Sequence, residues 1–154
     1  MIIEGIISTT NDQGEPHFSA IGPVLDIEKA SIELRPFQPS TSLTNLQNHP
    51  FGIFHLIDDA TLFASLICQS DERLEYAKSR SGNGFVLNNC TGWFEFEMKH
   101  IDLSNNRAFI VGLLTDQANV RPFRGFNRAH HAILEASILA SRIAFLPMQL
   151  FDTE

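Results

Sequence analysis

Short β-branched and apolar segments separated by turn residues run through the first third of the chain, a pattern typical of antiparallel strands. Residues 2–10 and 17–25 flank the loop NDQGEP and are predicted to form a hairpin, with Gly14 in a left-handed turn position. Residues 31–37 (SIELRPF) alternate apolar and polar positions and are predicted as a half-buried third strand, ended by its own proline and the one that follows.

Two further regions carry clear strand patterns. The segment FGIFHLI at 51–57 is largely apolar, as expected for a buried fourth strand. Residues 93–103 (WFEFEMKHIDL) alternate regularly, and residues 108–115 (AFIVGLLT) are predicted to pair with them after the turn SNNR. On the first of these two strands, the side chains predicted to face one way are Phe94, Phe96, Met98 and His100, and those predicted to face the other way are Trp93, Glu95, Glu97 and Lys99.

Three segments have helical signals. Residues 41–48 are predicted as a short helix that Pro50 ends. Residues 58–68 (DDATLFASLIC) place apolar side chains at helical spacing after Asp58 or Asp59, either of which is a suitable N-cap. The last helix is predicted from residue 127 to about residue 145. Its buried stripe is expected to consist of Ala129, Ile133, Ala136 and Ala140, widened by Leu134, Ile138 and Phe145.

The polar segment 69–89 contains SGNG and is predicted as a loop, and it is the best candidate for a mobile lid. The pattern as a whole gives six strands, two short helices and one long C-terminal helix, without an internal repeat or a linker. Because strands precede helices, we expect a mainly β fold, a closed or nearly closed antiparallel barrel with helical additions. Residues 1–154 are interpreted as a single domain with a helical extension at about 127–145.

The composition excludes several classes of protein. With 44% apolar and 19% charged residues, the chain of 154 residues is far from the composition of disordered proteins. A net charge of −7 argues against nucleic acid as a partner, because that binding depends on Lys and Arg. No apolar run approaches the ~18 residues of a membrane span, and the N-terminus lacks the basic region of a signal peptide. Cys68 and Cys90 match no metal spacing, and together these features favour a soluble, cytoplasmic protein.

The stretch RPFQPSTSLTNLQ at 35–47 carries the most specific chemistry. It leaves a predicted strand at Arg35 and places Ser40, Thr41 and Ser42 where the first short helix begins. Unpaired amides and the helix dipole favour an anion at such a terminus, hydroxyl groups add donors, and a guanidinium can make a forked contact with phosphate. The alternative is that Ser40 or Thr41 simply caps the helix. The stretch alone leaves both interpretations open.

The order of these features resembles the flavin reductase-like, FMN-binding split β-barrel superfamily. In that superfamily the motif R-x-S-x-T-x-x-N-(I/L) receives the FMN phosphate, and a strand like FGIFHL follows it. The chain is also similar, over nearly its full length, to a prokaryotic family of FMN-binding split barrels of unknown function. This similarity lies in three ordered blocks: IIEGIISTTNDQGEPHFSAIGP, LRPFQPSTSLTNL and RPFRGFNRAHHAILEASILASR.

The resemblance implies an FMN site and a homodimer with FMN between the subunits. The residues that would hold the phosphate and ribityl chain are Arg35, Ser40, Thr41 and Ser42, with Asn45 close by. The strand residues that would pass the isoalloxazine, largely through backbone contacts, are His17, Ser19, Ala20, Ile21 and Gly22. Related chains more often read Asn-Ile-Ala-Pro-Met-Gly where this one has HFSAIG, so the surroundings of the reactive ring edge differ here.

A second basic cluster lies in RPFRGFNRAHH at 121–131, where the C-terminal helix begins. Arg128, Glu135 and Arg142 recur every seven residues, so they lie along one helix face and, flanked by apolar residues, are expected to be partly buried. One interpretation is an ion-pair row at a subunit interface. The other, which the superfamily's dimer implies, is that Arg124 and Arg128 reach the flavin of the partner chain.

The remaining candidates for chemistry are weak. Four of the six histidines lie on separate elements, and the adjacent His130 and His131 point about a third of a turn apart on a helix, so no metal site is expected. His55, on an apolar strand, is expected to be a core histidine. No nucleophile motif accompanies either cysteine, and no catalytic residue is assigned.

The favoured function is therefore an FMN-binding protein that acts as, or derives from, a flavin-dependent oxidoreductase or flavin reductase-like enzyme. The cofactor carries the electron chemistry in such proteins, so the sequence need not contain a catalytic acid or base, and it does not identify the substrate. A nicotinamide donor or another small molecule is the expected reaction partner. The alternatives are a non-catalytic flavin-binding or sensing module, and a structural dimer without cofactor.

Overall fold

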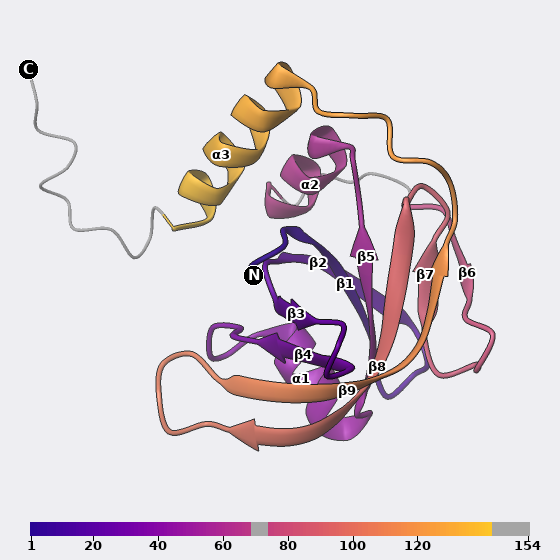
Figure 1. The fold of residues 1–154 in the computed structure, drawn as a ribbon. Helices are drawn as coiled ribbons and strands as arrows, with labels where there is room; N and C mark the ends of the chain where they lie inside the picture. The colour runs from indigo at the N-terminus through magenta and orange to yellow at the C-terminus, as the bar shows by residue number, and fades with distance from the viewer. Residues whose placement is uncertain (69–73, 143–154) are drawn as a thin grey trace, which may run out of the picture.

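The computed structural model describes residues 1–68 and 74–142 (Figure 1). Nine strands and three helices occur in these two ranges. In chain order they are β1 (Gly5–Thr10), β2 (Pro16–Ile21), β3 (Val24–Asp26), β4 (Ser31–Leu34), α1 (Thr41–Asn48), β5 (Phe51–Leu56), α2 (Ala60–Ile67), β6 (Tyr76–Lys78), β7 (Phe85–Leu87), β8 (Gly92–Asp102), β9 (Phe109–Asn119) and α3 (Arg128–Arg142).

Seven of the strands form one antiparallel sheet in the spatial order β2-β1-β5-β8-β9-β4-β3. Its two edge strands, β2 and β3, follow each other directly in the chain, and the sheet curls until these edges approach (Figure 1). An isolated bridge joins Ile2 to Val24, and the N–H of Ile3 donates to the carbonyl of Pro23 at 3.1 Å. The expected mainly β, antiparallel barrel with helical additions is confirmed.

The segment 17–25 is two strands and not one, which corrects the predicted hairpin partner. β2 pairs with β1 along its whole length, from Pro16 opposite Thr10 to Ile21 opposite Gly5, whereas β3 pairs with β4. Pro23 separates them because it has no N–H with which to continue the ladder. The prediction of six strands is too low for this reason and for a second one.

The second reason is a small hairpin within the segment that was predicted as a loop. β6 and β7 pair with each other around the sequence SGNG. The hydroxyl of Ser8 donates to the carbonyl of Phe85 at 2.6 Å, and Leu87 is 2% exposed, so the hairpin packs against the barrel. Residues 69–73 of the proposed lid lie outside the described residues.

Successive residues of the central strands point into two separate cores. One core lies on the side of α1, whose Leu43 and Leu46 pack against it; its strand residues include Ile7, Phe54, Phe94, Phe96 and Ile110. The other lies on the side of α2 and β7 and includes Ile6, Ile53, Leu62, Leu87, Cys90 and Trp93. Both faces of β1, β5 and β8 are thus covered, which explains why FGIFHLI is almost continuously apolar.

A buried ion pair holds the segment after β9 against the start of α2. The guanidinium of Arg121 donates to both carboxylate oxygens of Asp58, one of them at 2.8 Å, and the backbone N–H of Arg124 donates to the same carboxylate at 2.9 Å. The Asp58 side chain is only 1% exposed. The hydrogen bonds from Arg121 hold the pKa of Asp58 well below its usual range. Of the two aspartates that the sequence offered as N-cap, Asp59 caps α2.

Helix α3 packs on α2 and leaves most of its surface open (Figure 1). Its most buried residue in the described range is Ser137, and its half-buried neighbours include Ile133, Leu134 and Ile138. The expected stripe is wrong at Ala129, Ala136 and Ala140, which are exposed because the helix touches the barrel along one narrow face. Arg128, Glu135 and Arg142 are exposed as well, against the expectation of partial burial.

The C-terminal part of the prediction has a further limit. Residues 143–145 of the predicted helix, including Phe145 of its stripe, lie outside the described residues. The assignment of residues 1–154 to a single domain stays a prediction. Among the described helices, none has the length and apolar character that a membrane crossing requires.

His55 on β5 is a core histidine, as predicted. It has no exposed surface, and its Nδ1 lies 3.0 Å from the carbonyl oxygen of Ile6. Burial lowers its pKa from the ordinary 6.5 to about 4, so the imidazole is neutral at pH 7 and Nδ1 donates its proton to that carbonyl.

We expect His55 to make the stability of the protein depend on pH. The folded-state pKa lies below the unfolded one, so the unfolded chain binds the proton first, and the free energy of unfolding falls as the pH drops from 6.5 towards about 4. Over the full window the loss is about 3 kcal/mol. Urea denaturation at pH 7 and at pH 4.5 measures it. His55→Gln should remove most of this dependence, and His100→Gln, at an exposed position on β8, should retain it. An unchanged pH slope in the His55 variant would contradict the assignment.

The Asp58–Arg121 pair generates a second prediction. Arg121→Ala leaves the Asp58 carboxylate buried without its partner, and because Arg121 keeps 21% of its side chain exposed, we expect the low end of the range for buried pairs, about 3 kcal/mol. Arg80→Ala is the matched control: its pair with Asp116 is 67% and 37% exposed, so the cost should stay below about 1 kcal/mol. Denaturant unfolding measures the loss of unfolding free energy in each variant. Similar losses would show that the Asp58–Arg121 pair contributes no more to stability than the exposed pair.

Candidate anion site at the start of helix α1

Helix α1 begins at the hydroxyl cluster and leaves its amide end free of acidic side chains. Ser40 is the N-cap, with its hydroxyl oxygen accepting from the N–H of Leu43 at 3.4 Å and its carbonyl accepting from the N–H of Thr44 at 3.1 Å. The first turn contains no acidic residue. The capping interpretation is thus confirmed for Ser40, but capping uses only an acceptor, and the amides of the turn still favour an anion.

Two buried side chains of α1 fix the helix to the barrel. The hydroxyl of Ser42 lies 2.8 Å from that of Ser19 on β2, and the amide of Asn45 donates to the hydroxyl of Thr9 on β1 at 3.0 Å. Ser42 and Asn45 are 6% and 5% exposed. Asn45 therefore anchors the helix, and the Ser19–Ser42 contact places its first turn beside the edge strand. Thr41, in contrast, is exposed.

Arg35 follows β4 and stands exposed at the same corner of the barrel. Its guanidinium carbon lies 5.3 Å from the centroid of the Phe109 ring. The loop from Arg35 to α1 is attached to the tip of the β8–β9 hairpin by Gln38, whose side-chain amide donates to the carbonyls of Asn105 and Leu103 at 2.5 and 3.2 Å. Gln38 is a positioning residue that the sequence analysis missed, because its partners lie more than sixty positions away.

The strand β2 supplies the second set of predicted residues. All its residues are half-buried, and the contact of Ser19 with Ser42 puts Ser19 on the side of α1, with His17 and Ile21 on the same face. Phe18 packs against the core on the side of α2 and β7. Ala20 is two positions further along the strand, so it lies on the same face of β2 as Phe18. Burial lowers the pKa of His17, so its imidazole is neutral at pH 7.

Gly22, directly after β2, lies against the carboxylate of Glu4. A Cβ added at Gly22 would be 2.7 Å from the nearest Glu4 oxygen, so the Glu4 side chain would have to move to make room for it. Burial raises the pKa of Glu4, and the nearby Arg142 opposes that effect. Glu4 was not among the predicted site residues, because its neighbour Gly22 lies eighteen positions away in the chain.

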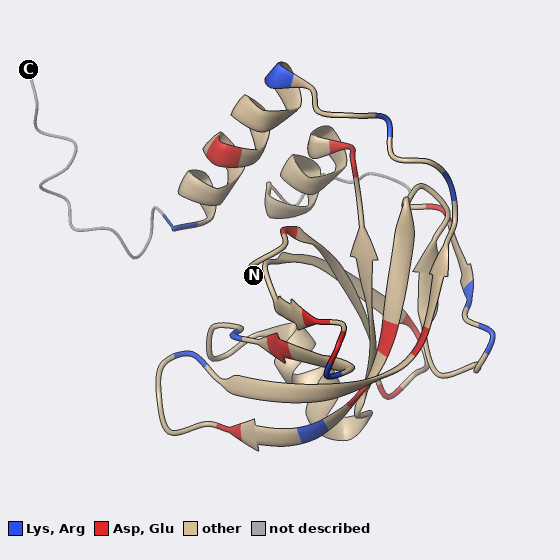
Figure 2. Cartoon of the chain, viewed as in Figure 1, with Lys and Arg blue, Asp and Glu red and all other residues tan. Residues whose placement is uncertain are grey.

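The second basic cluster does not join this corner within one chain. Arg124 and Arg128 are exposed beside the start of α3, at the opposite end of the barrel from α1 (Figure 1). Figure 2 shows an acidic position between two basic ones along α3, and these positions are Arg128, Glu135 and Arg142. The row exists as predicted, but it faces solvent in the single chain.

At the corner formed by Arg35 and Ser40–Ser42, Arg35 and Thr41 are exposed, Ser40 is half-buried and Ser42 is buried. Two cavities, of about 160 and 310 Å³, lie elsewhere, and neither is lined by these residues. Across residues 1–68 and 74–142, no three His, Cys, Asp or Glu side chains gather as metal ligands would. The donors of the corner are helix amides, hydroxyl groups and one guanidinium, a set that fits the oxyanion of a phosphate monoester.

Comparisons with known proteins agree with this fold. Residues 3–123 match the family described as "Protein of unknown function (DUF447) N-terminal domain". No curated protein matches the chain.

Three solved structures illustrate the similarity. An FMN-bound protein of the DUF447 family from Methanosarcina mazei superposes with a TM-score of 0.77 at 22% identity, covering 98% of this chain and 80% of that one. The flavin reductase of the styrene monooxygenase from Pseudomonas putida S12 gives 0.63 at 10% identity, with 77% and 82% covered. The NADH:FAD oxidoreductase of Streptomyces globisporus, in complex with NAD and FAD fragments, gives 0.64 at 8% identity, with 81% and 86% covered.

At these identities the structural similarity establishes the fold, which is the flavin reductase-like split barrel that the three sequence blocks suggested. The family match is independent of it and covers most of the sequence. We conclude that this chain belongs to the DUF447 family and contains the N-terminal domain of that family.

Proposed function

We propose that this chain binds FMN, with the phosphate at the first turn of α1. The observation that carries the proposal is the corner itself: a helix start without acidic residues, the exposed residue Thr41, and the exposed residue Arg35 on a loop that Gln38 holds in place. Charge-assisted hydrogen bonds to phosphate oxygens are about twice as strong as neutral ones, which suits this set of donors. The FMN bound to the family member from Methanosarcina mazei supports the same cofactor.

The isoalloxazine would then extend along β2. The Ser19–Ser42 contact sets the phosphate beside the middle of β2, and Gly22 lies three residues further, about 10 Å at the rise of a strand. A half-buried edge strand offers backbone N–H and carbonyl groups along its unpaired side. His17, Ser19, Ala20, Ile21 and Gly22 are the residues proposed to line the ring system, largely through their backbone.

We further propose that the protein is a flavin-dependent oxidoreductase that uses a nicotinamide or another small molecule as reaction partner. Bound FMN would supply the electron chemistry, and the residues of the chain would orient it and exclude water. The corner holds no pair of titratable side chains that could act as acid and base. Flavin reductases and an NADH:FAD oxidoreductase share the fold, which supports this class of reaction.

A homodimer is proposed as the working form. The exposed face of α3 carries Arg128, Glu135 and Arg142 in a row together with Leu139, which is 59% exposed. Two copies of such a row can pair opposite charges around an apolar centre. In that arrangement, Arg124 and Arg128 would reach the flavin of the second copy, which one chain alone does not allow.

Arg35 gives the sharpest test of the phosphate site. Arg35→Ala should weaken FMN binding by about 2 kcal/mol, or about thirtyfold, because it removes a charge-assisted contact. Riboflavin, which lacks the phosphate, should bind the variant and the wild type equally. Quenching of flavin fluorescence during titration measures both ligands.

Arg80→Ala is the matched control, since Arg80 is also exposed and also stacks on an aromatic ring, that of Trp93 at 5.6 Å. It should leave both affinities unchanged. An equal loss of FMN and riboflavin in the Arg35 variant would place that side chain away from the phosphate. No binding of FMN by the wild type would end the proposal.

The reaction is tested separately from the binding. When the FMN-loaded protein is mixed with NADH or NADPH without oxygen, an oxidoreductase should lose the visible absorbance of the flavin in a reaction that saturates with donor. A stable oxidised spectrum with both donors, in a protein that retains FMN, would favour the flavin-binding or sensing module instead.

A further inference from the structure

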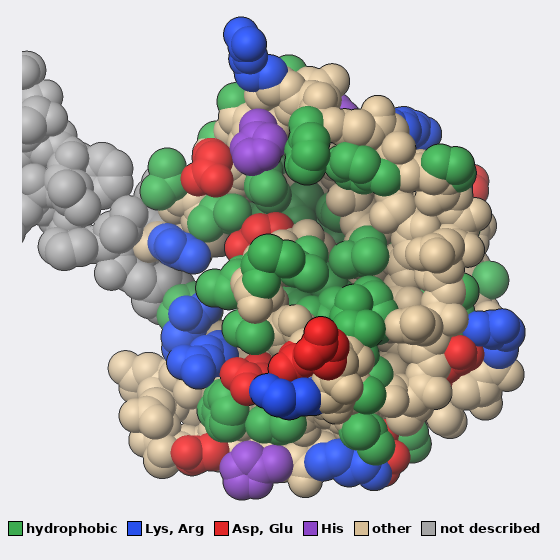
Figure 3. Space-filling model, in the orientation of Figure 1, with side chains coloured by type: hydrophobic (Ala, Val, Ile, Leu, Met, Phe, Trp, Pro, Cys, Tyr) green, Lys and Arg blue, Asp and Glu red, His purple; other side chains and the backbone are tan. Residues whose placement is uncertain are grey.

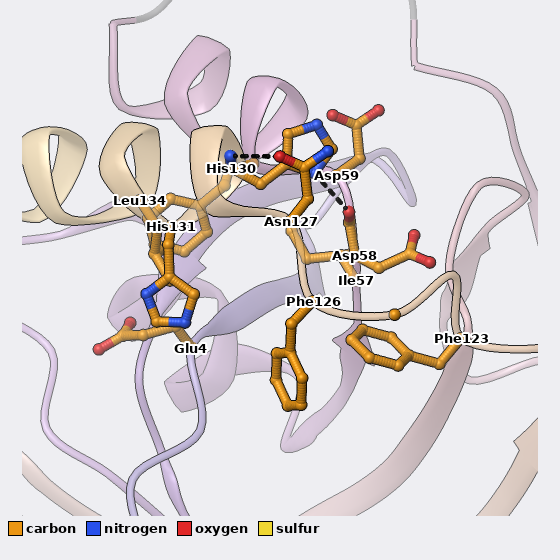
Figure 4. A pocket seen from close by; sticks show the side chains of 13 residues that line it. Glu4, Ile57, Asp58, Asp59, Phe123, Phe126, Asn127, His130, His131 and Leu134 are labelled. Carbon is orange, nitrogen blue, oxygen red and sulfur yellow. Dashed lines mark hydrogen bonds between the residues drawn. The ribbon is translucent and has the colours of Figure 1, made fainter.

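A cavity of about 160 Å³ lies between the first turns of α3, the start of α2 and the segment 123–127. Figure 3 shows a hollow walled by hydrophobic side chains, with a histidine and an acidic side chain at its rim. In the closer view of Figure 4, Glu4 and His131 lie on one side, Phe123 on the other, and Phe126 between them.

The size and lining of the cavity suit one apolar ring. Its walls include the side chains of Ile57, Phe63, Phe123, Phe126 and Leu134. Phe126 is 90% exposed and meets Phe123 edge to face at 5.5 Å, so an aromatic pair stands at the mouth with a large area free for a ligand. A cavity of about 150 Å³ with apolar walls holds benzene in an engineered protein, so a six-membered ring fits here.

Three polar groups at the cavity are free to bind a ligand. Among the described residues, no hydrogen-bond partner is present for the carboxylate of Glu4, the side-chain amino group of Asn127 or the imidazole of His131. The other polar groups are occupied. The carboxylate of Asp58 is paired with Arg121, that of Asp59 caps α2, and the imidazole of His130 contacts the carbonyl of Asp58 at 3.0 Å.

These groups indicate the charge and the substituent of the ligand. Glu4 lines the cavity as a hydrogen-bond acceptor, so a ligand hydroxyl group can donate to its carboxylate. Three carboxylates line the cavity; Arg121 pairs with that of Asp58, and Arg142 lies near that of Glu4. The remaining negative charge disfavours an anionic ligand, and the apolar walls disfavour burial of any charged ring, so we expect a neutral ligand.

The cavity adjoins the place proposed for the flavin. Glu4 lines it and also lies against Gly22, where the isoalloxazine is expected to end. A molecule in the cavity would thus lie next to the Gly22 end of β2, whereas the proposed phosphate site lies beside Ser19 in the middle of that strand. This link to the flavin rests on the proposed function; the binding of a ring in the cavity does not.

We propose that this cavity is a binding site for a neutral, single-ring molecule that carries a hydroxyl group, and that this molecule lies beside the flavin as its small-molecule partner. Phe123 and Phe126 contact the ring, and the carboxylate of Glu4 accepts a hydrogen bond from the hydroxyl group. The probes that test it are phenol, toluene of nearly the same size without the hydroxyl, and benzoate with a negative charge.

The first experiment uses the full chain without flavin and follows each probe by changes in amide chemical shifts. Phenol should bind and shift the amides of residues 123–134. Toluene should bind about fivefold more weakly for want of one hydrogen bond, and benzoate at least about tenfold more weakly. Equal binding of phenol and benzoate, or shifts spread away from the cavity, would overturn the site.

Two variants with matched controls identify the contacts. Glu4→Gln should weaken phenol about threefold to tenfold and leave toluene unchanged, because only phenol uses the carboxylate. Glu28→Gln, at an exposed turn, should change neither. Phe126→Ala should weaken both rings, whereas Ile27→Ala, also exposed and away from the cavity, should not. If the Phe126 variant binds both rings normally but breaks a dimer into monomers, a second copy of the chain occupies this surface and the proposal is wrong.

The second experiment repeats the phenol titration with FMN present and records the visible flavin spectrum. A shift of the flavin band that saturates together with the amide shifts supports the position beside the flavin. Binding of phenol without any change in the spectrum overturns that position. If FMN fails to bind while phenol still does, the proposed function fails and the ring site stands.

Discussion

The barrel depends on one short connection, in which Gly22 and Pro23 carry the chain from one edge of the sheet to the other. The carbonyl of Pro23 accepts a hydrogen bond from the N–H of Ile3, and Ile2 forms a β-bridge with Val24. The residues before β1 therefore hold this connection in place. With this closure in place, β2 becomes an edge strand beside α1, and Glu4 is pressed against Gly22. The two ends of the proposed ligand site are therefore positioned by the same connection that closes the sheet.

The parts of this site differ in how they are held. The start of α1 is fixed by two buried hydrogen bonds, to Thr9 and Ser19, and its preceding loop by Gln38. The aromatic cavity is held mainly by the buried pair of Asp58 and Arg121, which fastens the approach to α3. A phosphate would thus meet a rigid corner, whereas a ring in the cavity would meet a wall that depends on one ion pair and on the packing of α3 against α2.

The features predicted best from the sequence are those that depend on residues close together in the chain. Helix α1 has the predicted bounds because Ser40 starts it and Pro50 ends it. The β8–β9 hairpin was predicted from alternation, although two register shifts, between Glu95 and Phe96 and between Met98 and His100, interrupt that alternation. The β6–β7 hairpin was missed because β6 is exposed and β7 is an apolar run of only three residues, Phe85–Leu87, inside a polar segment. The buried face of α3 was wrong because its alanines fit either side of a helix, and only the position of α2 decides between them. The cavity could not be predicted, since its lining comes from three distant parts of the chain, represented by Glu4, Asp58 and the segment from Phe123 to His131.

The division of the central strands between two cores restricts where the chain can change in length. In β1, Ile6 and Ile7 point into different cores. Adding or deleting one residue within the strand would therefore turn every following side chain of β1 towards the opposite core. Insertions belong in turns, and the exposed β8–β9 tip is the obvious place. That tip, however, provides the carbonyl groups that accept hydrogen bonds from Gln38, more than sixty positions earlier in the chain. Lengthening the tip would therefore loosen the loop between Arg35 and α1. The β1–β2 turn at 11–15 does not hold that loop, but the carboxylate of its Asp12 contacts Asn48 and His49 where α1 ends, so a longer turn there would act on the other end of the same helix.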